Sequence, residues 1–142
     1  MIVAFCGHGD YMERQEDAKK IYNALKSAAS GSDVEFFLGG YGNFDSFAYR
    51  CAKRFKADHP TAVLTWVTPY ISAKCLENQF DRILFPPLEH CPPKYAISHR
   101  NRWMAEHADL IIAYVTHPYG GAYLMYQHAI QHGKQVYNIA NI

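Results

Sequence analysis

The sequence predicts an α/β fold in which a mostly parallel β-sheet carries helices on both faces. Apolar runs of strand length alternate along the chain with segments of helical periodicity, which is the order of strand–helix–strand units. The predicted strands are apolar at every position rather than at every second one, as expected of strands buried on both faces. The 142 residues have the length of one domain, so we expect a single doubly wound domain over residues 1–142.

Each element follows from its own stretch of sequence. Strands are predicted where short apolar runs occur, and helices where apolar residues recur every three or four positions. In chain order, the predicted elements are a strand at 2–6, a helix at 12–29, a strand at 34–38, a helix through 47–55, strands at 62–67 and 83–85, a helix at 94–107, a strand at 110–115, a helix at 122–132 and a strand at 135–139.

Turn and capping residues mark several boundaries between these elements. Asn43 or Asp45 is the predicted N-cap of the second helix, because short polar side chains satisfy the free N–H groups of a first turn. Gly133 stands where a glycine is expected to end a helix. Proline pairs at positions 86–87 and 92–93 exclude a helix from the irregular segment that contains them.

Composition limits the classes of protein to which the chain can belong. Hydrophobic residues make up 49% of it, which argues against disorder. The net charge of +1 gives no global field toward DNA or an acidic membrane, so we expect neither nucleic acid nor a membrane as a partner. No apolar stretch approaches the ~20 residues that a membrane span requires, and the N-terminus does not have the pattern of a secretory leader.

The four cysteines, Cys6, Cys51, Cys75 and Cys91, contain no CxxC pair. They would suffice for two disulfides in a secreted protein, but a chain of this length does not depend on such bonds for stability. Cys6 and Cys51 also fall within apolar patterns, where a thiol usually fills core space. We therefore expect reduced thiols and a cytoplasmic protein.

Glycine-rich turns follow three of the predicted strands. Because the carboxyl ends of parallel strands share one edge of the sheet, all three turns are expected to open onto the same edge. Glycine lets the backbone approach a ligand, and the free N–H groups of the helices that follow attract anions. These turns predict a site for a phosphorylated ligand, with a purely structural role in tight turns as the alternative. Their glycines are Gly7 and Gly9, then Gly39, Gly40 and Gly42, and finally Gly120 and Gly121.

Arginine supplies the counter-charge that an anion site needs. Arg100 and Arg102 are two residues apart, so on a helix their side chains diverge by roughly 200° and only one of them faces the site. Arg100 is the predicted one, because helical spacing puts it on the same face as Met104.

Other polar and aromatic side chains near these turns have two possible roles each. His8 is either a base or phosphate donor, or a solvated loop histidine. Asp45 is a helix-start residue, a catalyst or both. Tyr41, Tyr119 and Tyr123 either stack on a base or fill an interface.

The last predicted helix bears on metal binding and on oligomerisation. His128 and His132 are four residues apart, but the sequence shows no acidic residue near them, so we expect no metal; no cofactor is expected either. Tyr123, Met125 and Tyr126 gather on the same helix. A large exposed aromatic patch is uncommon on a monomer, which favours a homodimer.

Several motifs resemble those of the SLOG superfamily, the Rossmann-like group that includes the LOG phosphoribohydrolases and the DprA-like domains. The resemblance covers nearly the whole chain and is nearest to the small standalone branch. It implies a Rossmann-like fold and a pocket for a nucleotide or nucleotide derivative, commonly in a dimer. The motifs are Gly7-His8 after the first strand, a glycine-rich second turn that ends at the acidic Asp45, a helix that contains the RN-x-x-M motif from Arg100 to Met104 and runs into a strand, and the pair Gly120-Gly121.

The same resemblance implies one departure from the family pattern. LOG enzymes that cleave nucleoside monophosphates carry a glutamate whose position falls on Gln127 here, and Ala122-Tyr123 replaces a small Gly/Thr pair. An amide cannot stabilise a developing positive charge as a carboxylate does, nor act as a general base. We therefore expect binding without hydrolysis. The alternative is a nucleoside 5'-monophosphate phosphoribohydrolase, with an acid such as Asp45 in place of the glutamate.

The expected function is binding of a phosphorylated nucleotide or an ADP-ribose-like signal at the carboxyl edge of the sheet. Such a protein suits a bacterium or phage, as a sensor or a sequestering protein. A nucleic-acid binder like the DprA-like domains is a third hypothesis, against which the near-zero charge and the lack of a basic stripe argue. The residues predicted to bind the ligand are Gly7, His8, Gly9, Gly39, Gly40, Gly42, Asp45, Arg100, Asn101, Thr116, Gly120 and Gly121.

Overall fold

The computed structural model describes residues 1–70 and 79–141, whose strands form one parallel sheet. Six strands lie within these residues, in the order β4-β3-β2-β1-β5-β6 across the sheet, and each neighbouring pair is parallel. The predicted parallel α/β fold is therefore confirmed. The strands are β1 (Ile2–Gly7), β2 (Glu35–Leu38), β3 (Val63–Val67), β4 (Arg82–Leu84), β5 (Leu110–Tyr114) and β6 (Gln135–Asn138).

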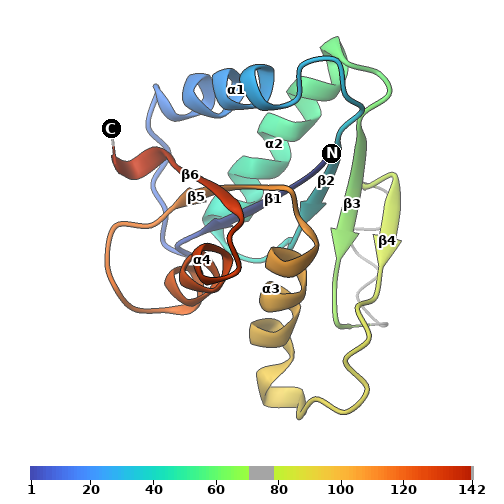
Figure 1. Cartoon of the computed structure of the whole chain (residues 1–142), viewed down its shortest axis with the longest axis vertical. Coiled ribbons are helices and arrows are strands. Elements are labelled where there is room, and N and C mark those ends of the chain that lie inside the picture. Colours follow the sequence, from blue (N-terminus) through green and yellow to red (C-terminus); the bar gives the residue numbers. More distant parts are fainter. Residues whose placement is uncertain (71–78, 142) are drawn as a thin grey trace.

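Helices cover both faces of this sheet. Figure 1 shows α1 and α2 on one side of the strands and α3 and α4 on the other. Since β1 lies between β2 and β5, the connections diverge to opposite faces beside β1, and ligands of open α/β sheets bind beyond the strand ends at such a point. The helices are α1 (Asp17–Ala28), α2 (Asn43–Asp58), α3 (Ala96–His107) and α4 (Gly121–Gln131), with the 3-10 turns η2 (Pro93–Tyr95) and η3 (Ile139–Asn141).

Successive residues of the central strands β1, β2 and β5 enter two different cores, as the pleat of a strand requires. On the side of α1 and α2, Phe5 of β1 joins a cluster rich in phenylalanine, which we call the aromatic core. On the other side, Cys6 joins a cluster in which alanine and methionine predominate, which we call the alanine–methionine core. Main members of the aromatic core are Phe5, Phe36, Phe44, Phe47 and Phe55, and those of the alanine–methionine core are Ala4, Met104, Ala105, Ala113, Met125 and Ala129.

The first helix begins at Asp17 and not at Met12 as predicted. Asp17 is fully buried, and its carboxylate accepts hydrogen bonds from Tyr11 Oη (2.6 Å) and from Arg14 Nη2 (2.8 Å). These bonds hold residues 11–16 as a loop folded back on the start of the helix. An apolar pattern alone does not reveal a buried carboxylate that organises the preceding loop.

The cap predictions had opposite outcomes. Gly42 is the N-cap of α2, and neither Asn43 nor Asp45 caps it: the amide of Asn43 donates to the carbonyl of Tyr11 (3.2 Å). Gly133 does end α4 as predicted, with φ of 70°. Its N–H donates to the carbonyl of Ile130 (3.1 Å), while the next residue's N–H reaches Ala129.

Three of the four cysteines, Cys6, Cys51 and Cys91, are free thiols in the structure, as predicted. Burial raises the pKa of Cys6 and raises that of Cys51 to about 11, so neither is an activated nucleophile. Cys75 lies outside the described residues. Among the helices that the structure describes, none combines the length and the apolar character needed to cross a bilayer.

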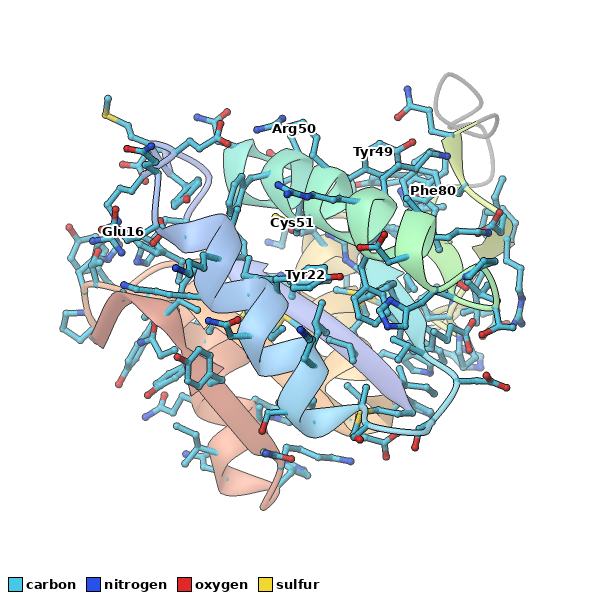
Figure 2. All side chains as sticks on the ribbon, turned by 90° about the horizontal axis from the view of Figure 1, so that it is seen from above. Glu16, Tyr22, Tyr49, Arg50, Cys51 and Phe80 are labelled. Atoms are coloured by element: carbon cyan, nitrogen blue, oxygen red, sulfur yellow. The ribbon has the colours of Figure 1, made fainter. Side chains whose placement is uncertain are left out.

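A hollow of about 530 Å³ lies between α1 and α2. Tyr22 Oη of α1 donates to the carboxylate of Asp58 at the end of α2 (2.7 Å), and Cys51 lines the same hollow. Figure 2 shows Tyr22 and Cys51 between the two helices. None of the residues predicted to bind a ligand lines this hollow.

Candidate functional site

The three glycine turns meet around one cavity of about 180 Å³ at the carboxyl end of β1, which we call the edge cavity. It lies where the connections diverge to the two faces of the sheet. Small-molecule sites usually enclose about 300–1,000 Å³, so this cavity has room for part of a nucleotide and not for all of it. Six of the twelve predicted residues line it, namely Gly7, Gly9, Asp45, Arg100, Asn101 and Gly121.

The other six predicted residues lie elsewhere. His8 and Thr116 line a neighbouring cavity of about 300 Å³, which we call the histidine cavity. Gly39 lies behind the edge cavity, where an added Cβ would be 2.9 Å from Asp45 Oδ2 and 3.1 Å from Arg100 Cζ. The three remaining residues, Gly40, Gly42 and Gly120, have positive φ and form the turns without lining either cavity.

Gly7 has a packing reason to be glycine. A Cβ built at this position would lie 2.2 Å from Cγ of Phe44, whose side chain is fully buried at the start of α2. The Phe44 ring therefore occupies the place of a side chain at the end of β1. This close approach brings the N-terminus of α2 against β1 and so shapes one wall of the edge cavity.

Arg100 is the arginine that faces the cavity, while Arg102 is exposed. Arg100 is 2% exposed, and its Nη1 donates to the carbonyls of Gly39 and Val67, each at 2.9 Å. Those carbonyls end β2 and β3. Burial lowers the pKa of Arg100, and the Asp45 carboxylate opposes that shift. Arg100 thus joins two strand ends as well as lining the cavity, a structural task that its helical spacing did not reveal.

Asp45 is the acidic residue of the edge cavity. Its Oδ2 accepts a hydrogen bond from the N–H of Tyr41 (3.0 Å). Burial raises the pKa of Asp45 to about 6, against the lowering effects of that hydrogen bond and of the Arg100 charge. Near neutral pH this carboxyl group can therefore both accept and, when protonated, donate a hydrogen bond.

The N-terminus of α4 is the part of the cavity best suited to an anion. Gly120, with φ of 93°, is its N-cap and provides no side-chain hydrogen bond. The N–H groups of Gly121, Ala122 and Tyr123 donate to no group within the described residues. By contrast, the first N–H of α2, that of Asn43, donates to the carbonyl of Gly9 (3.1 Å). Gly121 and Ala122 line the edge cavity, so unpaired donors lie along its wall.

His8 is a buried histidine and not a solvated one. Its Nε2 accepts a hydrogen bond from the N–H of Thr116 (3.0 Å), and its ring stacks on that of His117 with centroids 3.7 Å apart. His117 in turn stacks on Tyr119, which is 66% exposed. Burial lowers the pKa of His8, and the neighbouring His117 lowers it further. His8 is thus held neutral and joins the ends of β1 and β5.

Sequence reasoning missed part of both cavities. Ala122 and Met125 line the edge cavity, and no motif marked them. Arg14 lines the histidine cavity but falls in a segment predicted as helix. Tyr41, which the sequence assigns either to stacking on a base or to an interface, lines the edge cavity and is 70% exposed. Gln127, at the position of the LOG glutamate, is exposed on α4 and does not line the cavity.

The apolar patch predicted on α4 differs from the observed one. Met125 is 2% exposed and belongs to the alanine–methionine core, and Tyr123 and Tyr126 pack against that core. The exposed apolar residues of the helix are Leu124 and Ile130. The homodimer stays a prediction.

Comparisons with solved structures show the fold of this chain in DNA processing protein A. The protein from Streptococcus pneumoniae matches with a TM-score of 0.63 at 16% identity, over 94% of this chain and 48% of that one. The protein from Helicobacter pylori, whose structure concerns its single-stranded DNA binding mode, matches with a TM-score of 0.62 at 15% identity, over 96% and 63%. This chain thus spans about half to two thirds of their length.

No family model and no curated protein sequence matches the chain. At such low identities the structural matches show a shared Rossmann-like fold, which is the fold that the SLOG resemblance implies.

One prediction is overturned by this comparison. The near-neutral charge led us to expect no nucleic-acid partner, yet the same fold occurs in a protein that binds single-stranded DNA. The inference was wrong because binding of a strand depends on where basic and aromatic groups lie on the surface and not on the sum of all charges. Net charge is therefore no ground for excluding nucleic acid here.

Proposed function

We propose that this protein binds a phosphorylated nucleotide with its phosphate in the edge cavity. The observation that carries the proposal is the meeting of three glycine turns and the unpaired N–H groups of α4 at the point where the sheet connections diverge. Sensing and sequestration of a nucleotide signal both require this binding step and no further chemistry.

The phosphate is assigned to the N-terminus of α4. Gly121 and Ala122 line the cavity and have unpaired N–H groups, and each charge-assisted hydrogen bond from such a group contributes about 1.5–3 kcal/mol. The helix terminus adds about 0.3–1 kcal/mol. Micromolar affinity requires about 8 kcal/mol, so these groups supply about 3–7 kcal/mol of it and contacts to the sugar and base must supply the rest.

The sugar and base are assigned to the second turn. The Asp45 carboxyl group lies in the same cavity and suits a ribose hydroxyl, which both donates and accepts hydrogen bonds. Because its pKa is raised to about 6, Asp45 repels a phosphate less than an ordinary aspartate would. Tyr41 is exposed at the mouth and offers a ring on which a base can stack.

Single-stranded DNA is the second candidate ligand. The cavity is too small to enclose a whole nucleotide. A nucleotide that is bound only in part leaves its remaining atoms outside, where they can continue into a longer strand. DNA processing protein A of Helicobacter pylori favours this candidate, since it has the same fold and its structure concerns its single-stranded DNA binding mode. Base stacking contributes roughly 1–3 kcal/mol per base, and exposed tyrosines such as Tyr41 and Tyr119 provide the rings.

Hydrolysis of a nucleoside monophosphate is the less favoured function. The residue at the position of the LOG glutamate, Gln127, is exposed on α4, and Asp45 is then the acid that would have to serve. Incubation with AMP, followed by chromatography for free adenine and ribose 5-phosphate, tests this alternative. We expect no product.

Titration calorimetry with AMP, ADP-ribose and an oligo-dT of about twenty residues separates the two binding candidates. A free-nucleotide site binds AMP or ADP-ribose with micromolar affinity and binds the oligonucleotide no more tightly than these. A strand-binding site prefers the oligonucleotide by a factor of about a hundred or more and loses affinity steeply with added salt. Absence of heat with all three ligands would refute binding at the edge cavity.

A further inference from the structure

We propose that Glu106, His128 and His132 bind one divalent transition-metal ion of the Zn²⁺ type where α3 meets α4. This site lies outside both cavities and is independent of the proposed function. Glu106 stands in the last turn of α3, His128 in the last turn of α4, and His132 directly after it. One potential ligand atom from each of the three side chains lies within 4.8 Å of the other two.

The side chains are already close to the geometry that a metal requires. His128 Nε2 and Glu106 Oε1 are 2.9 Å apart, and the rings of His128 and His132 have centroids 4.1 Å apart. Zinc takes nitrogen and oxygen ligands at about 2.0–2.2 Å, which puts the ligand atoms of a tetrahedral site roughly 3.3 Å from one another. The remaining gap is to be closed by rotation of Glu106 and His132, whose side chains are exposed.

One hydrogen bond of the cluster would be replaced by the metal: His128 Nε2 donates to Glu106 Oε1, so the ion takes the place of that proton, which metal binding releases or moves to Nδ1. His132 Nδ1 donates to the carbonyl of His128 (2.9 Å), so its Nε2 presents a lone pair outward. Metal-ligating histidines usually hold their second ring N–H in this way, by donation to a carbonyl or carboxylate. Lys134 Nζ donates to the main-chain carbonyl of Glu106 (2.7 Å) and not to its carboxylate, so the lysine does not compete with the metal for that group.

The donor set favours zinc over magnesium or calcium. Two imidazoles and one carboxylate are a common ligand set of zinc, whereas magnesium and calcium take oxygen ligands. Three protein ligands leave one position for water. A bound ion would join α3, which carries Arg100 and Asn101, to α4, which carries Gly121, and so fix two helices of the edge cavity relative to each other.

The spacing of the sequence concealed the carboxylate. Along the sequence, His128 and His132 form a helical pair without an acid, but Glu106 lies 22 residues before His128 and reaches it only because α3 and α4 pack side by side. This proposal replaces the expectation that the chain binds no metal.

The test measures zinc uptake and thermal unfolding of the full chain after treatment with EDTA and buffer exchange. We expect one Zn²⁺ per chain by titration calorimetry, and a rise in Tm of about 5–10 °C when free zinc exceeds Kd a hundredfold. His132→Ala and Glu106→Gln are expected to lose the uptake and the shift while unfolding near the wild-type Tm in EDTA. His90→Ala, which removes an exposed histidine elsewhere, serves as the matched control and retains both.

The contrary results are equally definite. Absence of uptake by the wild type would overturn the proposal. Equal uptake by wild type and His132→Ala would show that zinc binds at another place, and retention of uptake by Glu106→Gln would remove the carboxylate from the site. Any of these three outcomes overturns the three-residue site.

Discussion

The two cores of this protein have different compositions, and the edge cavity lies on the side of the smaller side chains. The aromatic core packs phenylalanine rings from β1, β2 and α2 against one another, for example Phe36 against Phe55 with centroids 5.6 Å apart. The alanine–methionine core brings Met104 of α3 and Met125 of α4 to the wall of the edge cavity. Large rings fill space completely, whereas alanine lets helices approach closely and methionine adapts to an irregular boundary.

This difference indicates that the aromatic core contributes most to stability, and that the side of the alanine–methionine core carries the surface proposed to bind a ligand. Phe44 connects the two, because its ring lies over Gly7 in the aromatic core while the backbone of Gly7 lines the cavity. We therefore expect substitutions on the aromatic side to change stability most, and substitutions at the cavity to change ligand affinity and pH dependence.

The largest expected effect on stability is that of Phe44→Ala. Removing this fully buried ring should lower the free energy of unfolding by about 3–5 kcal/mol, measured by urea denaturation. Met125→Leu, a change of similar volume in the other core, should cost less than about 1.5 kcal/mol. A greater loss of unfolding free energy for Met125→Leu than for Phe44→Ala would show that the alanine–methionine core, and not the aromatic core, contributes most to stability.

Gly7→Ala should cost about 1–3 kcal/mol, because its Cβ would meet the Phe44 ring. The clash disappears when that ring is absent. In a double-mutant cycle, Gly7→Ala should therefore cost at least about 1 kcal/mol less in the Phe44→Ala background than in the wild type. Simple additivity of the two changes would show that the ring does not determine the choice of glycine.

Asp45→Asn should remove a pH dependence of folding stability that originates in the edge cavity. The pKa of Asp45 is about 6 in the folded protein against an ordinary 3.8, so its stabilising contribution is full below about pH 4 and is lost as pH rises through 6. At pH 7.5 we expect the variant to be the more stable protein by about 1–3 kcal/mol. A wild type that is equally or more stable at this pH would contradict the raised pKa.

His8→Gln should give a smaller effect that responds to pH in the opposite direction. The pKa of His8 is lowered in the fold, so its contribution is present above its ordinary value of 6.5 and is lost as pH falls below it, when the Nε2 acceptor for Thr116 is protonated. Between pH 7.5 and pH 5 the Tm of the wild type should fall further than that of the variant. Equal falls would mean that His8 keeps its ordinary pKa.

Most of the fold was predictable from sequence, because it depends on local patterns. Continuous apolar runs indicated buried strands, and Gly133 marked the end of α4 by its backbone requirement alone. The start of α1 was not predictable, since it depends on how the buried Asp17 binds Tyr11 and Arg14.

The candidate site was predictable only as a set of turns. Strand order brings Gly7, Asp45 and Gly121 to one cavity, and glycine spacing after strands predicted that meeting. The role of Arg100 in joining β2 to β3 depends on two main-chain carbonyls that no motif encodes. The partner of His128 is Glu106, which only the packing of α3 on α4 reveals.

The central claim is that the unpaired N–H groups of α4 bind phosphate. Gly121→Asp tests it, because a Cβ there meets no atom within 4 Å and an acidic residue in a first turn stabilises a helix by about 0.3–1 kcal/mol. The fold should survive while the new carboxylate occupies the phosphate site. We predict that calorimetry shows at least about tenfold weaker binding of AMP to Gly121→Asp, and less than threefold weaker binding to the neutral control Gly121→Asn. Wild-type affinity for AMP in the folded Gly121→Asp protein would contradict the account.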